Sequence, residues 1–333
     1  MAGPGQRNLI TDIDGLAVGN AEDSHALTGV TVLLPDRPML VAADVRGGAP
    51  GTREISALAP TCLVDRVDAI VLSGGSVFGL DAAGAVALQL SVMGRGWPVG
   101  EFRAPIVPAA ILQDLTNGGD KNWGEEPPYR RLARAAMAAA SVDFALGNAG
   151  AGLGATAGPL KGGLGSASIL FDDGLAVGAL IAVNAVGSPL GGGSLLASPY
   201  ALEGEFEALG GVGARSPEIH LGNAEIGANT TIGIIATNAT LDKAQAQRVA
   251  IMAHDGLARA IRPIHTPFDG DTLFALSTGD RPLGGPAARA LTQIGAVAAD
   301  CVARAVGRAV FEADSLGAFP GYRDYRAGHE AGE

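Results

Sequence analysis

The chain has 333 residues, of which 47% are hydrophobic and 17% are charged, a balance typical of a packed globular protein. Its net charge of −11 argues against nucleic-acid binding, because contacts with phosphates need clustered Lys and Arg side chains. No uninterrupted apolar run is long enough to span a membrane, and the two cysteines form neither a metal-ligand pair nor a disulfide framework. The first residues lack the apolar segment of a secretory signal, so we expect a soluble, cytoplasmic protein.

The first half of the chain is typical of short buried strands joined by glycine-rich turns. We expect strands over residues 8–18 (with a turn), 28–34, 41–45 and 68–72. A long apolar helix over residues 77–93 follows the sequence Ser73-Gly-Gly-Ser76. Residues 118–129 are polar and rich in Pro and Gly, which predicts a surface loop.

The second half alternates helices with strands. A helix is expected over residues 130–140 and a buried strand over residues 175–183, before a stretch rich in Gly, Ser and Pro from 187 to 229 that holds a short acidic helix near 203–209. A strand from Thr230 is then followed by a helix over 241–261, a strand over 271–277, an Ala/Val-rich helix over 286–313 and a turn-rich surface tail. This order fits sheets covered by helices on their outer faces.

Residues 227–237 place a small, flexible segment directly before a β-branched run, with Thr230 as the first residue of the expected strand. If the bond between Asn229 and Thr230 is cut, Thr230 gains a free α-amine beside its own hydroxyl. An α-amine has a pKa of about 7.7–8, so it can act as the base for the attacking oxygen. The same residues are also ordinary strand sequence, and spacing alone favours that structural interpretation.

Two carboxylates flank one glycine in His265-Thr-Pro-Phe-Asp-Gly-Asp271, just before an expected strand. Asp269 and Asp271 could orient the amine and hydroxyl of Thr230, or share a proton near neutral pH. A calcium loop lacks its further ligands here, and a zinc site lacks an evident third or fourth strong ligand, so we expect no metal. A turn in which both aspartates cap backbone amides is an equally good interpretation.

Three further features could support such chemistry. Lys161 lies in an expected glycine-rich turn over residues 158–165, where, if buried, it could hold a hydroxyl deprotonated or support an oxyanion. Asn184 ends an apolar strand, an unusual place for an amide unless it serves as an oxyanion donor. The turn at Gly74 and Gly75 opens a helix and is expected to point its amides outward as a cradle for an anion or carbonyl, so we expect these glycines and Phe78 to contact substrate.

Taken together, these blocks resemble the self-processing β-aminopeptidases and nylon-oligomer hydrolases, a family of N-terminal-nucleophile enzymes distantly related to the ornithine acetyltransferases. The resemblance covers residues 8–313, and its specificity lies in the joint order of the blocks. The blocks are Asp44-Val-Arg-Gly-Gly-Ala-Pro-Gly-Thr-Arg-Glu54, Ser73-Gly-Gly-Ser-Val-Phe-Gly-Leu80, the lysine turn, Asn229-Thr-Thr231 and His265-Thr-Pro-Phe-Asp-Gly-Asp271.

The resemblance implies one αββα sandwich over residues 1–333, cut into an α chain of residues 1–229 and a β chain of residues 230–333. It also implies a homo-oligomer of αβ units that uses no cofactor and acts on a small amide or short peptide. The implied roles are the nucleophile for Thr230, the residue before the cut for Asn229, contacts to the nucleophile and oxyanion for Lys161 and Asn184, and orienting carboxylates for Asp269 and Asp271.

Two departures from the family pattern bear on the substrate. The nucleophile here is a threonine, as in the nylon-oligomer hydrolases, whereas many of the β-aminopeptidases use serine. Residues 107–114 hold no glutamate where those aminopeptidases carry one for the free amine of the substrate, which favours a broader amide hydrolase. An acyltransferase with the same acyl-enzyme, and an uncleaved binding protein, are the alternatives.

Overall fold

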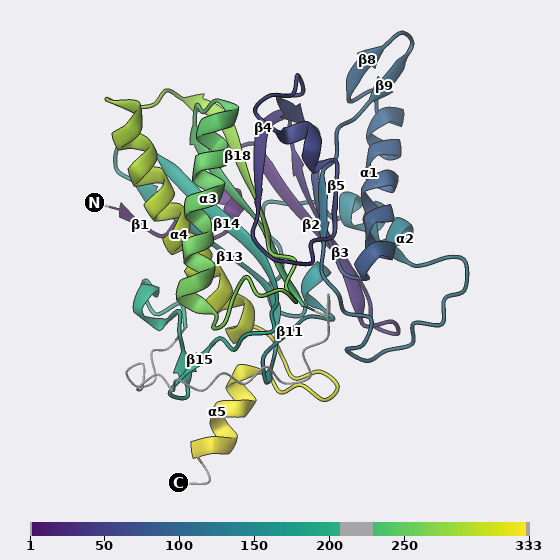
Figure 1. Cartoon of the computed structure of the whole chain (residues 1–333), viewed down its shortest axis with the longest axis vertical. Coiled ribbons are helices and arrows are strands. Elements are labelled where there is room, and N and C mark those ends of the chain that lie inside the picture. Colours follow the sequence, from purple (N-terminus) through teal and green to yellow (C-terminus); the bar gives the residue numbers. More distant parts are fainter. Residues whose placement is uncertain (1, 207–228, 331–333) are drawn as a thin grey trace.

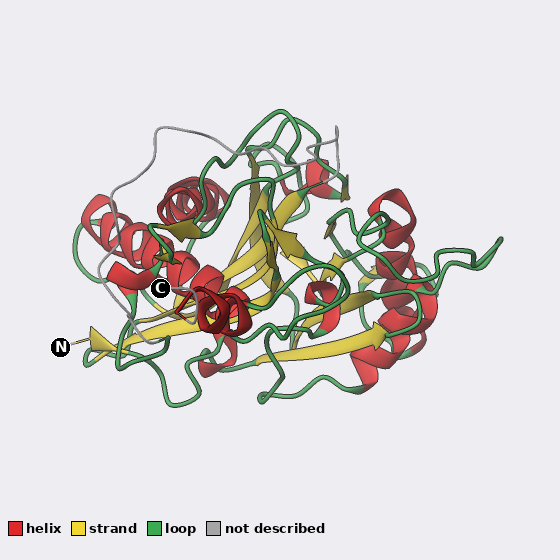
Figure 2. Ribbon diagram, turned by 90° about the horizontal axis from the view of Figure 1, so that it is seen from below, coloured by secondary structure: helices red, strands yellow, loops and turns green. Residues whose placement is uncertain are grey.

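The computed structural model of the chain describes residues 2–206 and 229–330, and it is a stack of four layers. Two β-sheets lie face to face, and a pair of helices covers the outer face of each sheet (Figure 1). The view from below shows helices on both sides with the strands between them (Figure 2). This is the αββα sandwich that the resemblance implied.

The larger sheet has seven strands, and helices α3 (Lys243–Ala260) and α4 (Ala287–Phe311) cover it. β17 pairs antiparallel with β14 and parallel with β18, and α3 is the crossover between β17 and β18. In sheet order the strands are β1 (Ala2–Gly3), β13 (Gly163–Phe171), β14 (Ala176–Asn184), β17 (Thr230–Ala239), β18 (Thr272–Arg281), β4 (Met39–Val45) and β6 (Arg66–Val67).

The smaller sheet has five strands, and helices α1 (Asp81–Val92) and α2 (Tyr129–Ala138) cover it. In sheet order the strands are β2 (Leu16–Asp23), β3 (Thr28–Pro35), β7 (Ile70–Ser73), β10 (Ala109–Ile111) and β5 (Thr52–Arg53). The remaining elements are the strand pairs β8 (Trp97–Val99) with β9 (Phe102–Ala104), β11 (Thr156–Ala157) with β12 (Leu160–Lys161) and β15 (Leu190–Gly191) with β16 (Ser194–Leu195), helix α5 (Tyr322–Glu330), and 3-10 turns at Ile10–Asp12, Ile55–Leu58, Ser76–Leu80, Gly150–Gly152 and Ser198–Tyr200. None of the helices in residues 2–206 and 229–330 is long and apolar enough to cross a membrane.

The alternation of side chains along β17 decides on which face of the larger sheet the Thr230 side chain lies. Ile232 and Ile234 belong to the apolar cluster between the two sheets, whereas Ile235 belongs to the cluster under α3 and α4. Because successive side chains of a strand point to opposite faces, Thr230 lies on the face between the sheets. Thr231 lies on the face covered by the helices.

Small residues let α4 approach the larger sheet closely. A Cβ on Gly165 of β13 would lie 1.9 Å from the carbonyl oxygen of Ala305, and one on Gly163 would lie 2.4 Å from that of Ala309. These glycines are therefore required by helix-on-sheet packing. The many glycines make residues 158–165 typical of a turn in sequence. In the structure a turn at residues 158–159 joins β11 to β12, and β13 begins at Gly163.

Most expected helices and strands are confirmed, but the structure differs from the expectations at several places. The tail beyond residue 314 contains α5, and the strand expected over residues 8–18 is a 3-10 turn followed by the start of β2. The acidic helix expected near 203–209 is absent from residues 203–206, which form a turn and a bend, and the rest of that stretch lies outside the described residues. Cys301, one of the two cysteines, is fully buried in the core.

A buried ion pair ties three distant segments together. The Arg304 guanidinium on α4 donates to both carboxylate oxygens of Glu205, at 2.7 and 2.6 Å, and also to Oδ1 of Asn8 at 2.8 Å. Arg304 is fully buried and Glu205 nearly so. Burial alone would raise the pKa of Glu205, but its bonds to Arg304 and Asn8 hold that pKa below the ordinary value.

Replacing Glu205 by Leu should lower the free energy of unfolding by about 3–5 kcal/mol at neutral pH, because Arg304 would remain buried without a counterion. Since the folded-state pKa of Glu205 is depressed, its contribution is present above the unfolded pKa of about 4.3 and is lost as the pH falls through the folded value. The difference between wild type and Glu205→Leu should therefore shrink in acid. Urea titrations at several pH values measure this difference in the free energy of unfolding. Glu126→Leu, at an exposed loop position, is the control. Equal unfolding midpoints for wild type and Glu205→Leu at neutral pH would contradict a stabilising role for the Glu205–Arg304 pair.

Candidate active site

Four adjacent strands of the larger sheet begin or end at the same end of that sheet. β14 ends at Asn184, opposite Thr230, which begins β17. Asp269 and Asp271 immediately precede β18, and β4 ends at Val45 beside the start of β18. The topology thus brings together residues that lie far apart in the sequence. Asn184, Thr230 and the two aspartates are each at most 2% exposed.

Thr230 lies directly against the peptide bond that would be cut. Its hydroxyl donates a hydrogen bond to the carbonyl oxygen of Asn229. Asn229 forms a bridge with Asp269 of the neighbouring segment, so the backbone on both sides of the bond is aligned with the start of β18. A Cβ on Gly270 would lie 2.9 Å from Oγ1 of Thr230 and 2.6 Å from the carbonyl oxygen of Ala49. Glycine at position 270 is therefore what lets this loop approach the hydroxyl.

Asp271 holds the residue next to Thr230. Its Oδ1 accepts the backbone amide of Thr231 at 2.7 Å. Its Oδ2 accepts the backbone amide of His265 at 3.1 Å and lies 2.7 Å from Nδ1 of the His265 ring. The carboxylate is fully buried, so these three contacts fix its orientation.

Asp269 organises its own loop. Its Oδ2 accepts from the amide and the hydroxyl of Thr266, at 2.9 and 2.5 Å, and its Oδ1 accepts the amide of Val186 at 3.4 Å. Burial, and then the nearby charge of Asp271, raise the pKa of Asp269. Both aspartates thus cap backbone amides, and they do so beside Thr230. Within residues 2–206 and 229–330 there is no group of three or more His, Cys, Asp and Glu side chains able to hold a metal.

Residues 46–49, a glycine-rich loop after β4, pack against the backbone of residues 269–271, the aspartate loop. The amides of Arg46 and Ala49 donate to the carbonyl oxygens of Asp271 and Asp269, at 2.9 and 2.8 Å. A Cβ on Gly47 would lie 2.2 Å from the carbonyl oxygen of Asp269, so this close approach requires glycine. The sequence marks these residues as a block but does not indicate that they contact residues 269–271.

Lys161 lies on strand β12, and it is buried although the sequence predicted a turn there. Its Nζ donates to the carbonyl oxygens of Gly152 and Gly162, at 2.8 and 3.0 Å. Burial lowers the pKa of Lys161 to about 7. With two hydrogens donated, the remaining position on Nζ carries a lone pair in the neutral form and a third hydrogen in the charged form.

Asn184 connects the β11–β12 pair, which carries Lys161, to β17, which begins at Thr230. Its Oδ1 accepts the amide of Thr156, which pairs with Lys161 across β11 and β12. Its Nδ2 donates to the carbonyl oxygen of Gln113 at 2.9 Å. One amide hydrogen that sequence analysis assigned to an oxyanion is therefore used to hold the segment after β10. Neither the Thr156 nor the Gln113 contact could be read from the sequence, because both depend on strand pairing.

The expectation of an outward-pointing amide cradle at Gly74 and Gly75 is wrong. The amide of Gly74 donates to the carbonyl oxygen of Gly29 at 2.9 Å, and that of Gly75 to Oδ1 of buried Asp114 at 2.8 Å. A Cβ on Gly75 would lie 1.9 Å from the ring of Tyr129, so these glycines serve close packing. Phe78, expected to contact substrate, is 44% exposed, so it is available for such a contact.

Phe78 has an aromatic neighbour that sequence analysis passed over. Its ring meets that of Trp123 edge to face at a centroid distance of 6.0 Å, and Trp123 meets Tyr129 at 5.8 Å. Trp123 comes from the loop before α2, and the expected loop character of residues 118–129 gave no sign of this contact.

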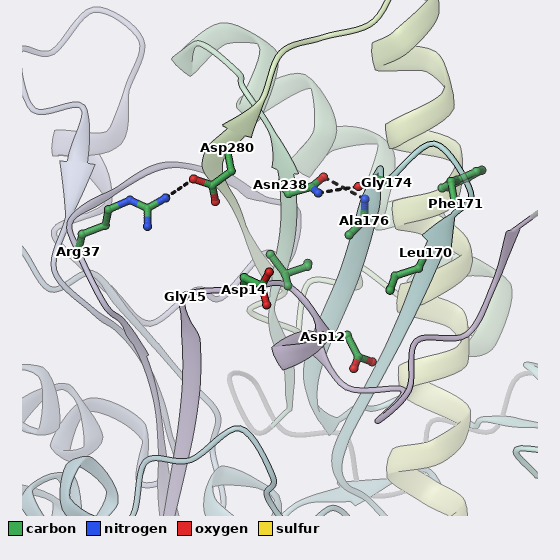
Figure 3. A pocket seen from close by; sticks show the side chains of 11 residues that line it. Asp12, Asp14, Gly15, Arg37, Leu170, Phe171, Gly174, Ala176, Asn238 and Asp280 are labelled. Atoms are coloured by element: carbon green, nitrogen blue, oxygen red, sulfur yellow. Dashed lines mark hydrogen bonds and ion pairs between the residues drawn. The ribbon is translucent and has the colours of Figure 1, made fainter.

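A separate cleft of about 410 Å³ lies at the opposite end of the larger sheet (Figure 3). It is lined in part by Asn238, which stands near the end of β17, the far end from Thr230. Several of its polar groups bond to each other or to nearby backbone: Arg37 pairs with Asp280, and Asn238 bonds to Ala176 and Gly174. We therefore do not assign the cleft to the catalytic site.

Solved structures identify the class of fold. A β-aminopeptidase from Burkholderia sp. aligns with a TM-score of 0.73 and 22% identity, covering 98% of this chain and 96% of that one. The L-aminopeptidase D-Ala-esterase/amidase from Ochrobactrum anthropi, whose structure is described as a variant of the Ntn hydrolase fold, aligns with a TM-score of 0.70 and 21% identity, covering 95% and 89%. The chain therefore has the fold of the N-terminal-nucleophile hydrolases.

Sequence relatives identify the family. Residues 8–323 match peptidase family S58. An uncharacterized aminopeptidase of Mycobacterium bovis is 43% identical, with 95% of this chain and 97% of the relative aligned. A 6-aminohexanoate-oligomer endohydrolase of Kocuria sp. is 30% identical, with 91% and 84% aligned. The chain belongs to peptidase family S58, and this membership makes it a hydrolase of peptide or amide bonds.

The contact at Gly270 yields a test of the site geometry. In Gly270→Ala the new Cβ would stand between the carbonyl of Ala49 and the Thr230 hydroxyl, so we expect the hydroxyl to be displaced and hydrolysis of an amide substrate to fall by roughly 10–100-fold. Steady-state assays measure the loss. Gly284→Ala is the matched control, because no atom lies within 4 Å of a Cβ at that position. Equal activity in all three proteins would place the hydroxyl outside the reaction.

Proposed function

We propose that this protein is a self-processing amide hydrolase whose nucleophile is Thr230, released by cleavage between Asn229 and Thr230. The observation that carries the proposal is the position of Thr230, buried as the first residue of a central strand with its hydroxyl bonded to the carbonyl oxygen of Asn229. A cut at this bond would place a new α-amine on the same residue as the hydroxyl, which is the arrangement that an N-terminal nucleophile needs.

In maturation, Oγ1 of Thr230 attacks the carbonyl carbon of Asn229. Lys161 in its neutral form takes the hydroxyl proton, and the resulting ammonium then stands near the oxyanion. The C–N bond breaks, the nitrogen takes up a proton as the α-amine of Thr230, and an ester joins Asn229 to Oγ1. Water hydrolyses that ester, which leaves an α chain of residues 1–229 and a β chain of residues 230–333.

In turnover, the α-amine of Thr230 takes over as the base. It accepts the hydroxyl proton as Oγ1 attacks a substrate amide, and Lys161 and Asn184 stabilise the tetrahedral oxyanion. The substrate amine leaves with the proton, and water then releases the acid from the acyl-threonine. Asp271 and Asp269 hold the backbone around Thr230 in place throughout.

The two chains would stay together as one domain after the cut. β17 and β18, from the β chain, lie between β14 and β4, which come from the α chain. The ion pair of Glu205 with Arg304 also joins the two chains. We propose that such units form a homo-oligomer. In support, Val92, Trp97 and Phe102, on α1 and the β8–β9 pair, are 83%, 67% and 77% exposed, more than apolar residues usually are.

The substrate is proposed to be the amide bond of a short peptide or an oligoamide. The named relatives include both an aminopeptidase and an oligomer endohydrolase. Residues 107–114 hold no glutamate, so no carboxylate of that kind is available there for a free amine at the substrate terminus. This supports an amide hydrolase that is broader than a strict aminopeptidase.

A pair of neighbouring threonines provides the decisive test of the proposed nucleophile. Thr230→Val should remain a single full-length chain, whereas Thr231→Val should mature into masses matching residues 1–229 and 230–333. The Thr231 hydroxyl is buried and has no hydrogen-bond partner among the described residues, so its removal should leave stability equal or slightly higher. Intact-mass spectrometry under denaturing conditions reads the result. A Thr230→Val protein that still splits at this bond would refute the proposal.

The lowered pKa of Lys161 gives a pH test of maturation. Because the neutral amine is the proposed base, the rate of self-cleavage should rise as the pH increases through about 7 and then level off. Lys161→Met should cleave at least about 100-fold more slowly and lose that rise. The measurement follows pulse-labelled precursor shifted to buffers from well below to well above pH 7. A rate that falls through the same range would instead assign the charged form of Lys161 to the reaction.

A further inference from the structure

His265 makes an unusual pair of contacts to a single carboxylate oxygen. Both its ring Nδ1 and its backbone amide reach Oδ2 of Asp271, at 2.7 and 3.1 Å. Sequence analysis set aside a zinc site in this block and gave His265 no other role. In the structure its contacts are directed at Asp271, which is fully buried.

The backbone at His265 is held in a strained conformation. Its φ of 58° lies in the left-handed region, which side chains other than glycine seldom occupy, although Asn, Asp and His do so more often than others. This conformation turns both the amide and the ring of His265 toward the same oxygen of Asp271. Such strain persists where the surrounding contacts impose it.

A second histidine fixes the His265 ring from the side. His254 on α3 meets it edge to face at a centroid distance of 4.9 Å. Burial lowers the pKa of His254 to about 4, so this ring is neutral near neutral pH. Its Nε2 is bound to the carbonyl oxygen of Asp44 at 3.1 Å, which anchors it to β4. The His265 ring is therefore restricted in rotation.

These contacts reach the nucleophile through one carboxylate. With Oδ2 of Asp271 held by His265, its Oδ1 is directed at the amide of Thr231, at 2.7 Å. That amide nitrogen is bonded to the carbonyl carbon of Thr230. A rotation of the Asp271 carboxylate would therefore move the backbone of the nucleophile itself.

We propose that His265 is a positioning residue for Thr230 and that its ring acts through Asp271. The inference rests on the proposed function and adds a residue to it. His265 keeps the carboxylate in the one orientation that holds the Thr231 amide, and so sets the approach of the Thr230 hydroxyl to the Asn229 carbonyl.

Three substitutions at position 265 separate the ring contact from the backbone conformation. His265→Asn tolerates a left-handed φ, and its Nδ2 stands as many bonds from Cα as Nδ1 of His, so it can donate to Asp271. His265→Asp has the same shape but places a carboxylate oxygen there. His265→Gly permits the backbone conformation and has no side chain.

The readout is the rate of self-cleavage, followed by intact mass on pulse-labelled precursor, with thermal unfolding of each variant alongside. We expect His265→Asn to stay within roughly threefold of wild type, and His265→Gly and His265→Asp to be slower by roughly 10–100-fold. If His265→Gly fails to fold, the comparison of Asn with Asp decides, because these two side chains have the same shape but only Asn can donate to Asp271, whereas Asp brings a second carboxylate.

The outcomes for the two proposals can be told apart. Equal rates in the Asn, Asp and Gly variants, with Thr230→Val uncut, would overturn the role of His265 and leave the nucleophile assignment intact. If the cleavage rates of the Asp and Gly variants fall in proportion to their thermal stability, His265 has a structural role only. That result would also overturn the inference. Cleavage of Thr230→Val at the same bond would remove the basis of both proposals.

Discussion

The pairing of β17 between β14 and β18 is the constraint on which the site depends. It places Thr230 opposite Asn184 on one side and next to the aspartate loop on the other. The hydrogen bonds of these pairs continue for most of the length of β17, so the first residue of the strand is held by everything that stabilises the sheet. A nucleophile at a strand start is positioned more rigidly than one on a free loop, since its backbone cannot move without breaking the ladder.

With Thr230 at the buried start of β17, the ionisable groups around it are buried as well. Lys161, Asp269 and Asp271 are all at most 1% exposed, and a buried charge is costly unless it is paired or hydrogen-bonded. The structure offsets the cost with backbone groups: carbonyl oxygens surround the lysine, and amides surround the aspartates. Glycines at 47 and 270 make this possible, because the backbone must come closer than a Cβ allows.

The sequence predicted the layered fold, and the position of four candidate site residues at strand ends, better than it predicted the contacts of those residues. Thr230, Asn184 and the two aspartates could be placed at strand ends because β-branched runs mark where strands begin and stop. Their partners could not be predicted, since the contact of Asn184 with Gln113 and that of Asp271 with Thr231 depend on strand order and register. Local sequence carries no information on either.

Glycine was the residue whose sequence context misled most. At Gly75 the sequence is typical of a turn, and the structure has a left-handed turn there, but it also uses this glycine to let Tyr129 approach; at Gly165 the glycine lies in β13 and lets α4 approach the backbone. The same residue type can serve turns and close packing, and only the neighbours in space show where close packing applies. Helix α5 was missed for a different reason: the residues before it are turn-rich, and its own helix is short and polar.

Burial also shifts three ionisable groups at or near the site toward the neutral form. It lowers the pKa of Lys161 to about 7 and that of His254 to about 4, and it raises the pKa of Asp269. A lysine exposed to solvent would carry its proton throughout the physiological range and could not accept another. The burial of Lys161 is therefore consistent with the self-cleavage that we propose, because the reaction needs a basic amine before the cut, when the α-amine of Thr230 does not yet exist.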